Sequence, residues 1–132
     1  RLVKKRDFWM PFTPSIRIER VADYVINPDG FESPYMALSF DSTDLAREHL
    51  KAAIHPADQT LRLQAVYEHW NPEYYAIILE FERLTGIGGI LNTSFNLHGE
   101  PNVSTARDAV RTVDQSGLNY LILGDFLLKK RA

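Results

Sequence analysis

The sequence has no cysteine among its 132 residues. This absence excludes a disulfide framework, a thiol nucleophile and a cysteine metal site, and it fits a reducing compartment such as the cytoplasm, where we expect the protein. Basic charge is not in excess either, because 15 basic and 17 acidic residues give a net charge of −2, so nucleic acid is not an expected partner. No apolar run is long enough to cross a bilayer, and we expect neither a signal peptide nor a membrane partner.

Several motifs of common active sites are also missing. The chain has neither a G-x-x-x-x-G-K-[ST] loop nor a G-x-G-x-x-G turn, which excludes Walker-type and Rossmann nucleotide sites as far as motifs can. Its four histidines show no metal-ligand spacing, so we predict no metal site in this chain. Ser94 lies outside a G-x-S-x-G turn, which argues against a serine hydrolase.

What the chain does contain is an alternation of strand-like and helix-like segments. This alternation predicts one domain of α/β or α+β class, with a mixed sheet flanked by helices. Residues 16–26 have near-helical apolar spacing, and residues 61–69 alternate as a strand. Residues 119–130 predict two strands, or one bent strand, around Gly124.

Two helices have clear end signals. Asn71 is a suitable N-cap for a helix over residues 72–85, and Gly86 is a suitable C-terminal stop. Thr105 and Asp108 resemble a capping box at the start of another helix.

The stretch GGILNTSFNLHGEP, residues 88–101, predicts a strand that ends in a cluster of short polar side chains. Such side chains are hydrogen-bonding groups that suit a ligand held near the backbone at a strand end. If strand geometry continues past the apolar residues, Asn92, Ser94 and Asn96 share one face, and Phe95 points to the opposite face as a core anchor. The alternative is that these side chains only shape and cap a turn.

Basic residues at two places could hold an anion. The stretch KKRD places Lys4, Lys5 and Arg6 beside an aromatic pair, and such cations can bind phosphate, Arg bidentately and Lys as a point charge. Arg62 stands between two leucines and should point away from them in a strand. Either group could instead be a solvated surface feature, and the apolar–polar periodicity does not decide between a ligand site and a plain surface.

Taken together, the segments KKRDFWMPFTPSI, HPADQTLRLQAV, NPEYYAIILEFERLTGI and LNTSFNLHGEP resemble the C-terminal, YrdC-like domain of the NodU/CmcH family of O-carbamoyltransferases. The resemblance implies a YrdC-like fold that binds carbamoyl phosphate and ATP, with Mg²⁺ as part of the co-substrate, and forms carbamoyladenylate. A preceding actin-like ATPase-fold domain, which carries the family's metal site, would pass the carbamoyl group to a hydroxyl acceptor. Because the chain opens at Arg1 in a charged stretch, we interpret it as a fragment that has this domain as a partner; a homodimer is an open alternative.

The resemblance also implies roles for single residues. The K-x-R part of the family signature corresponds to Lys4 and Arg6, which would contact phosphate oxygens, and its S-x-N part corresponds to Ser94 and Asn96. Arg62 would contact carbamoyl phosphate, and it is, with Ser94, a candidate catalytic residue. Asn92, Ser94 and Asn96 would hold the carbamoyl group and phosphates. The candidate binding residues are therefore Lys4, Arg6, Arg62, Asn92, Ser94 and Asn96.

The sequence departs from the family pattern at two places. Met10 stands where the family usually carries Arg, and the loop from His55 to Arg62 has an extra residue and lacks a Gly. These departures motivate an alternative, in which the domain kept the fold as a non-catalytic interaction or scaffold module. Binding of another nucleotide or of RNA is a third hypothesis, which the acidic balance disfavours.

Overall fold

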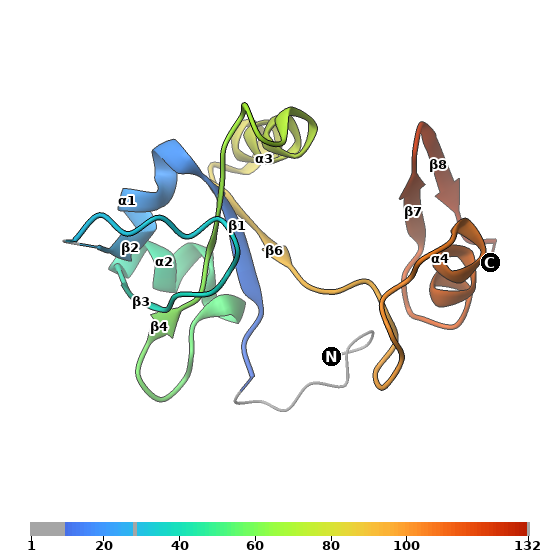
Figure 1. The fold of residues 1–132 in the computed structure, drawn as a ribbon, viewed down its shortest axis with the longest axis horizontal. Helices are drawn as coiled ribbons and strands as arrows, with labels where there is room; N and C mark the ends of the chain where they lie inside the picture. Colours follow the sequence, from blue (N-terminus) through green and yellow to red (C-terminus); the bar gives the residue numbers. More distant parts are fainter. Residues whose placement is uncertain (1–9, 28, 132) are drawn as a thin grey trace. The chain divides into compact units, whose positions relative to one another are not determined.

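The computed structural model describes residues 10–27 and 29–131, which fall into two compact units (Figure 1). The larger unit, which we call the sheet unit, contains the described residues up to Thr93. The smaller, which we call the hairpin unit, contains the described residues from Ser94 onward. Short strands and helices alternate in sequence, so the chain has the predicted α+β class. That the chain folds as a single domain stays a prediction.

The strands of the sheet unit form two small sheets, one in the order β5–β1–β6 and one in the order β2–β3–β4. The central strand β1 runs parallel to β5 and antiparallel to β6, so this sheet is mixed, as predicted. In the other sheet, β3 is antiparallel to both neighbours. The strands are β1 (Thr13–Arg17), β2 (Val25–Ile26), β3 (Phe40–Ser42), β4 (Thr60–Leu61), β5 (Gln64–Val66) and β6 (Gly89–Asn92).

The helices of the sheet unit are α1 (Val21–Tyr24), α2 (Asp44–His49) and α3 (Pro72–Thr85), with 3-10 turns at Ile18–Arg20 and Lys51–Ala53. The long helix α3 begins and ends as predicted. The Asn71 side chain accepts a hydrogen bond from the backbone N–H of Tyr74, and Gly86 adopts the left-handed conformation, with φ of 77°. Helix α3 packs against β1 and β6 and so fixes one flank of the mixed sheet.

Two sequence predictions for the sheet unit are wrong in part. The predicted helix over residues 16–26 contains the end of β1, and α-helix is confined to Val21–Tyr24. The backbone of β1 pairs with strands on both sides, and this long-range pairing outweighs the local helical spacing. The predicted strand over residues 61–69 is split into β4 and β5, which belong to different sheets.

The core of the sheet unit lies on one face of β1. Ile16 is fully buried there, and a Cβ on Gly89 of the neighbouring strand would approach Ile16 to 3.0 Å, which shows how closely the two strands and α2 are packed. Tyr24 is also fully buried, and its hydroxyl accepts a hydrogen bond of 2.8 Å from the N–H of Gly88. The buried residues of this core are Ile16, Tyr24, Val25, Phe40, Ala46, Leu50, Ala53, Leu61, Leu63 and Ala65.

The hairpin unit consists of α4 (Ala106–Asp114) and the antiparallel strands β7 (Tyr120–Leu123) and β8 (Phe126–Lys129). The two-strand alternative is therefore confirmed, with Gly124 in the turn at a φ of 57°. Phe95 is partly buried and packs against the core of this unit, although it lies beyond the end of β6 and not on a strand face as predicted. In the described part of the chain, no helix is both long and apolar enough to cross a membrane.

The capping box at the start of α4 is confirmed. The Asp108 N–H donates to the Thr105 hydroxyl oxygen at 3.2 Å, and the Thr105 N–H donates to the Asp108 carboxylate at 3.0 Å. Hydrogen bonds from the Thr105 hydroxyl and N–H hold the pKa of Asp108 below its usual value.

Candidate functional site

The face of β1 opposite the core is polar. Side chains alternate along a strand, so Thr13, Ser15 and Arg17 lie together on the face opposite Ile16. Ser15 is completely buried and Thr13 nearly so. Buried hydroxyl groups require hydrogen-bond partners, and Ser15 finds them on the neighbouring strands.

Ser15, Gln64 and Asn92 form a hydrogen-bond network with one residue from each strand of the mixed sheet, which we call the three-strand network. The Ser15 hydroxyl donates to Gln64 Oε1 at 2.8 Å. Asn92 Nδ2 donates to Ser15 Oγ and to Gln64 Oε1, each at 3.0 Å. The network follows from the strand register, in which Ser15 is paired with Gln64 while Asn92 is paired with Thr13.

Helix α3 covers the Arg17 end of this polar face. Arg17 Nη1 donates to the Tyr75 hydroxyl at 3.0 Å, and Nη2 forms an ion pair with Glu82. Arg20 Nε lies 2.9 Å from the other carboxylate oxygen of Glu82. Burial by itself would lower the pKa of Arg17, but the hydrogen bonds to Glu82 and Tyr75 raise it above its usual value. This cluster joins helix α3 to the Arg17 end of the polar face.

A groove of about 240 Å³ lies at the Thr13 end. Arg62 is exposed in its wall, whereas Leu61 and Leu63 on either side are buried, which confirms the predicted alternation. Within the described residues, the Arg62 guanidinium has no hydrogen bond or ion pair. The groove is lined by Met10, Pro11, Phe12, Thr13, Ser39, His55, Thr60, Leu61 and Arg62.

The loop from His55 to Thr60 forms a compact turn beside this groove. His55 Nδ1 lies 3.1 Å from Asp58 Oδ1, and the same oxygen accepts the N–H of Thr60 at 3.0 Å and its hydroxyl at 2.9 Å. The hydrogen bond from the Thr60 N–H has the largest effect in lowering the pKa of Asp58, and the bond from the Thr60 hydroxyl lowers it further. The Asp58 carboxylate is thereby engaged with its own loop, and it leaves Arg62 unpaired.

The sheet unit has a larger hollow of about 500 Å³ that suits an anion less well. Its walls are mainly apolar, with Val21, Val25 and Phe40 among them, and Glu32 contributes negative charge. No Lys or Arg is among the described residues that line it. An anionic ligand is therefore better matched by the groove at Arg62.

The predicted site residues are distributed over both units. Arg62 lines the groove and Asn92 belongs to the three-strand network, both within the sheet unit. Ser94 and Asn96 belong to the hairpin unit. Lys4 and Arg6 lie outside the described residues.

Asn92, Ser94 and Asn96 do not share a strand face, because β6 ends at Asn92. The partner strand β1 begins at Thr13, which pairs with Asn92, so the ladder stops there. Beyond this point Ser94 Oγ donates to Asn96 Oδ1 at 2.7 Å, and Asn96 Nδ2 donates to the Glu100 carbonyl at 2.6 Å. These local bonds have the form expected of side chains that shape a turn.

Sequence reasoning did not single out Ser15 and Gln64. A signal was present, since each is a polar residue inside a strand-like segment that carries the family resemblance. Ser15 ends the PF-x-PS segment, and Gln64 stands two positions after Arg62 in R-x-Q-x-V. Their connection to Asn92 depends on strand pairing between distant segments, which a single sequence does not reveal.

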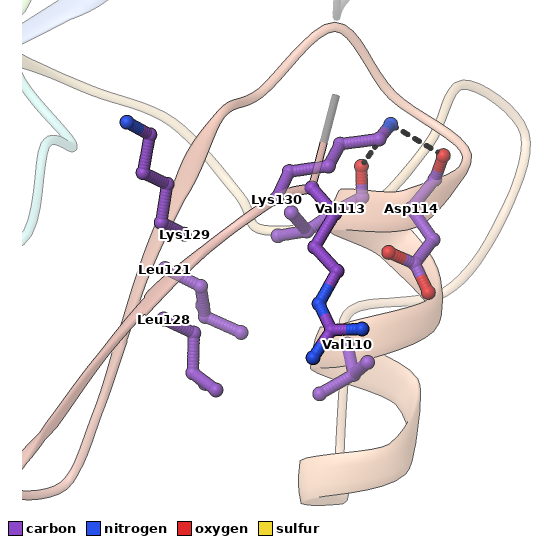
Figure 2. A pocket seen from close by; sticks show the side chains of 8 residues that line it. Val110, Val113, Asp114, Leu121, Leu128, Lys129 and Lys130 are labelled. Carbon is purple, nitrogen blue, oxygen red and sulfur yellow. Dashed lines mark hydrogen bonds between the residues drawn. The ribbon is translucent and has the colours of Figure 1, made fainter.

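A pocket of about 460 Å³ in the hairpin unit lies between α4 and the hairpin (Figure 2). Lys130 reaches back to the end of α4, where its ammonium donates to the carbonyl groups of Val113 at 3.3 Å, Asp114 at 2.6 Å and Ser116 at 3.1 Å. A cation at this position satisfies the last carbonyl groups of the helix and complements its dipole. Lys130 therefore caps α4. Of the predicted site residues that the structure describes, none lines this pocket.

Acidic and histidine side chains do not gather into a metal site in the part of the chain that the structure describes. No group of three such residues there could hold a metal ion. The chemistry that these residues offer is therefore anion binding by Arg62 together with neutral hydrogen bonding by the amides.

Residues 1–130 match the sequence model of the family described as "Carbamoyltransferase C-terminus". The chain belongs to this carbamoyltransferase family.

Among its relatives, nodulation protein NolO of Bradyrhizobium diazoefficiens is 37% identical over 131 residues, which cover 98% of this chain and 24% of the relative. Nodulation protein NolNO of Sinorhizobium fredii is 38% identical over 131 residues, with 98% and 19% covered. The 3'-hydroxymethylcephem-O-carbamoyltransferase of Amycolatopsis lactamdurans is 32% identical over 125 residues, with 93% and 23% covered. The chain thus spans about a quarter or less of the length of these curated relatives.

Proposed function

We propose that the groove at Arg62 binds carbamoyl phosphate, and that the domain uses it with ATP to form carbamoyladenylate. The observation that carries the proposal is the exposed Arg62 guanidinium, which has no partner among the described residues and lies in a groove of about 240 Å³. This volume suits a small anion. Membership of the carbamoyltransferase family supports carbamoyl phosphate as this anion.

The proposed chemistry needs positioning and charge neutralisation rather than a protein nucleophile. Carbamoyl phosphate, ATP and water would give carbamoyladenylate, phosphate and pyrophosphate. In this balance the bond between the carbamate oxygen and the phosphorus of carbamoyl phosphate breaks, and water takes the phosphoryl group as phosphate. The carbamate oxygen then bonds to the α-phosphorus of ATP, and pyrophosphate leaves. Arg62 would hold phosphate oxygens bidentately and lower the cost of the charge that builds up there.

The remaining roles come from the family resemblance and are part of the proposal. Lys4 and Arg6 would contact phosphate oxygens, and Asn92, Ser94 and Asn96 would hold the carbamoyl group and phosphates. Mg²⁺ would enter with ATP. A further domain of a longer polypeptide would transfer the carbamoyl group to a hydroxyl acceptor, in keeping with the name of the O-carbamoyltransferase relative.

Calorimetric titration of the chain with carbamoyl phosphate, and separately with Mg²⁺ and ATP, tests the binding step. Arg62→Ala should weaken carbamoyl phosphate binding at least tenfold, since it removes a charge-assisted bidentate contact. Arg83→Ala is the matched control, because Arg83 is an exposed arginine of the same unit whose side chain bonds to Glu80 on α3. Equal affinity of Arg62→Ala and wild type would show that the groove is not the site.

The catalytic step is tested by carbamoyl-phosphate-dependent release of pyrophosphate from ATP by the full-length protein. Arg62→Ala and Ser94→Ala should each reduce the rate. A non-catalytic scaffold role is the second candidate, and Met10 favours it because an apolar side chain lines the groove where the family usually has a cation. Binding of both ligands by wild type without any pyrophosphate release would support the scaffold role.

A further inference from the structure

The larger hollow of the sheet unit, which we call the Glu32 hollow, has the dimensions of a ligand site. Its volume is about 500 Å³, and its walls are mainly apolar. Sites for small organic ligands typically measure about 300–1,000 Å³ and combine apolar walls with a few polar groups. Among the described residues, the Glu32 hollow and the groove at Arg62 share no wall residue. The hollow is therefore a second, separate cavity of the unit.

The Glu32 hollow lies on the other side of the mixed sheet from the three-strand network. Ala65 of β5 lines the hollow, and side chains alternate along a strand, so Ala65 and the neighbouring Gln64 of the network point to opposite faces. Leu63 and Tyr67, two residues before and after Ala65, also line the hollow. A ligand bound there would be on the face of the sheet opposite the network.

The segment that carries Glu32 is held in place on both sides of this residue. Before it, the Asn27 side chain accepts the N–H of Phe31 at 3.0 Å and donates to the carbonyl of Phe31 at 2.8 Å. After it, the buried Ser33 donates from its hydroxyl to the Leu63 carbonyl at 3.0 Å, and its own carbonyl accepts from the backbone of β5 at 2.7 Å. A ligand would thus meet the carboxylate in a wall that is already formed.

Glu32 and Tyr67 form the polar part of the wall. Burial first, and then the Glu32 charge and a hydrogen bond to Glu32, raise the pKa of Tyr67, whose hydroxyl donates to the carboxylate. A carboxylate has about four acceptor positions, so one such bond leaves others for a ligand. Among the described residues, no Lys, Arg or His side chain pairs with Glu32 or lines the hollow. The carboxylate therefore borders an apolar space without a counter-ion from this part of the chain.

The ring of Tyr67 is held by two further aromatic side chains. Its centroid lies 4.6 Å from that of Trp70 and 5.7 Å from that of His69. Neither of these two residues lines the hollow. Aromatic faces attract cations, and a desolvated cation more strongly than a solvated one. The Tyr67 ring and the Glu32 carboxylate thus favour the same charge in a ligand.

We propose that the Glu32 hollow binds an organic amine, with its ammonium group at Glu32 and Tyr67 and its apolar body against the apolar walls. The carboxylate would repel an anion, and a neutral apolar ligand would cover this charge without pairing it, which is unfavourable. An apolar chain or ring that ends in an ammonium group satisfies both parts of the cavity. The ligand class is therefore an alkyl- or arylalkyl-ammonium ion, which differs in charge from the anion proposed for the groove at Arg62.

Three probes with the same apolar body separate the effect of charge from that of burial. These are 4-phenylbutylamine, 4-phenylbutanol and 4-phenylbutyrate, which end in a cation, a neutral hydroxyl and an anion. In calorimetric titration of the wild-type chain at neutral pH, the amine should bind about tenfold more tightly than the alcohol, because it makes a hydrogen bond between two charged groups. The carboxylate should bind more weakly than the alcohol.

Glu32→Gln keeps the shape of the side chain and an acceptor for Tyr67 but removes the charge. It should reduce the preference for the amine over the alcohol to about onefold and leave the alcohol affinity unchanged. Glu48→Gln is the matched control, because it removes the same charge at an exposed position of α2 outside the hollow, and it should keep the preference. Ala22→Phe places a ring in the hollow from an exposed wall position and should weaken the amine and the alcohol alike.

The proposal is wrong if wild type binds the amine and the alcohol equally, or if it binds none of the three probes. It is also wrong if Glu32→Gln keeps the preference, or if folded Ala22→Phe binds both probes as tightly as wild type. Each of these results would leave the proposed function standing, because carbamoyl phosphate is assigned to a different cavity and its binding is measured separately.

Discussion

The carboxylate of Glu82 is predicted to be the strongest polar link between α3 and the mixed sheet. It pairs with Arg17, whose side chain is 12% exposed, and with Arg20, whose side chain is 32% exposed. Glu82→Gln keeps the shape of the side chain and one hydrogen-bond acceptor but removes the charge. The guanidinium of Arg17 then stays largely buried and keeps, among the described residues, only its longer ionic contact with Glu19, at 3.5 Å.

The expected destabilisation is about 2–3 kcal/mol. Replacing a charged acceptor by a neutral one costs about 1 kcal/mol for each of the two arginine contacts. The poorer compensation of the Arg17 charge adds to this, although less than the roughly 3–5 kcal/mol seen when a fully buried pair is broken, because the exposed Glu19 remains near Arg17 and the cluster retains some solvent contact. At about 4 °C for each kcal/mol, the melting temperature should fall by about 8–12 °C.

Thermal unfolding followed by circular dichroism at neutral pH measures this change, with Glu80→Gln as the matched control. Glu80 lies on the same helix and is paired only with Arg83, and both side chains are more than half exposed. Such surface pairs contribute little, and salt screens them. If Glu80→Gln and Glu82→Gln lower the melting temperature equally, the assignment of a buried ionic link is refuted.

Three further perturbations follow from the structure. Lys130→Met removes the ammonium that caps α4 and should destabilise the hairpin unit by about 2 kcal/mol, seen as faster amide hydrogen exchange in α4; Lys129→Met should leave exchange unchanged. The lowered pKa of Asp108 means that its stabilisation is present above its unfolded-state pKa and is lost as pH falls through the lowered folded-state value. Asp108→Asn should therefore lose less stability on acidification than wild type, and parallel curves would contradict this. Gly89→Ala places a methyl group 3.0 Å from Ile16 and should cost about 1–3 kcal/mol in urea unfolding; no loss would show that β6 can shift.

Local signals in the sequence located the elements whose ends depend on near neighbours. Asn71 and Gly86 define α3, and Thr105 and Asp108 begin α4, because caps act over three or four residues. The alternation around Arg62 likewise placed this side chain outside the core. In contrast, residues 16–26 were predicted as a helix because nothing local announces that β1 will be paired on both sides.

By itself, the sequence determined the family, the α+β class, both ends of α3, the start of α4, and the exposure of Arg62. Only the tertiary structure decided that β6 stops at Asn92, and that Ser15, Gln64 and Asn92 meet on one polar face. The physical reason is range. Helix caps and strand alternation depend on residues within one turn or one strand. The network depends instead on the register of three strands, and its hydrogen bonds join Ser15 to residues 49 and 77 positions further along the chain.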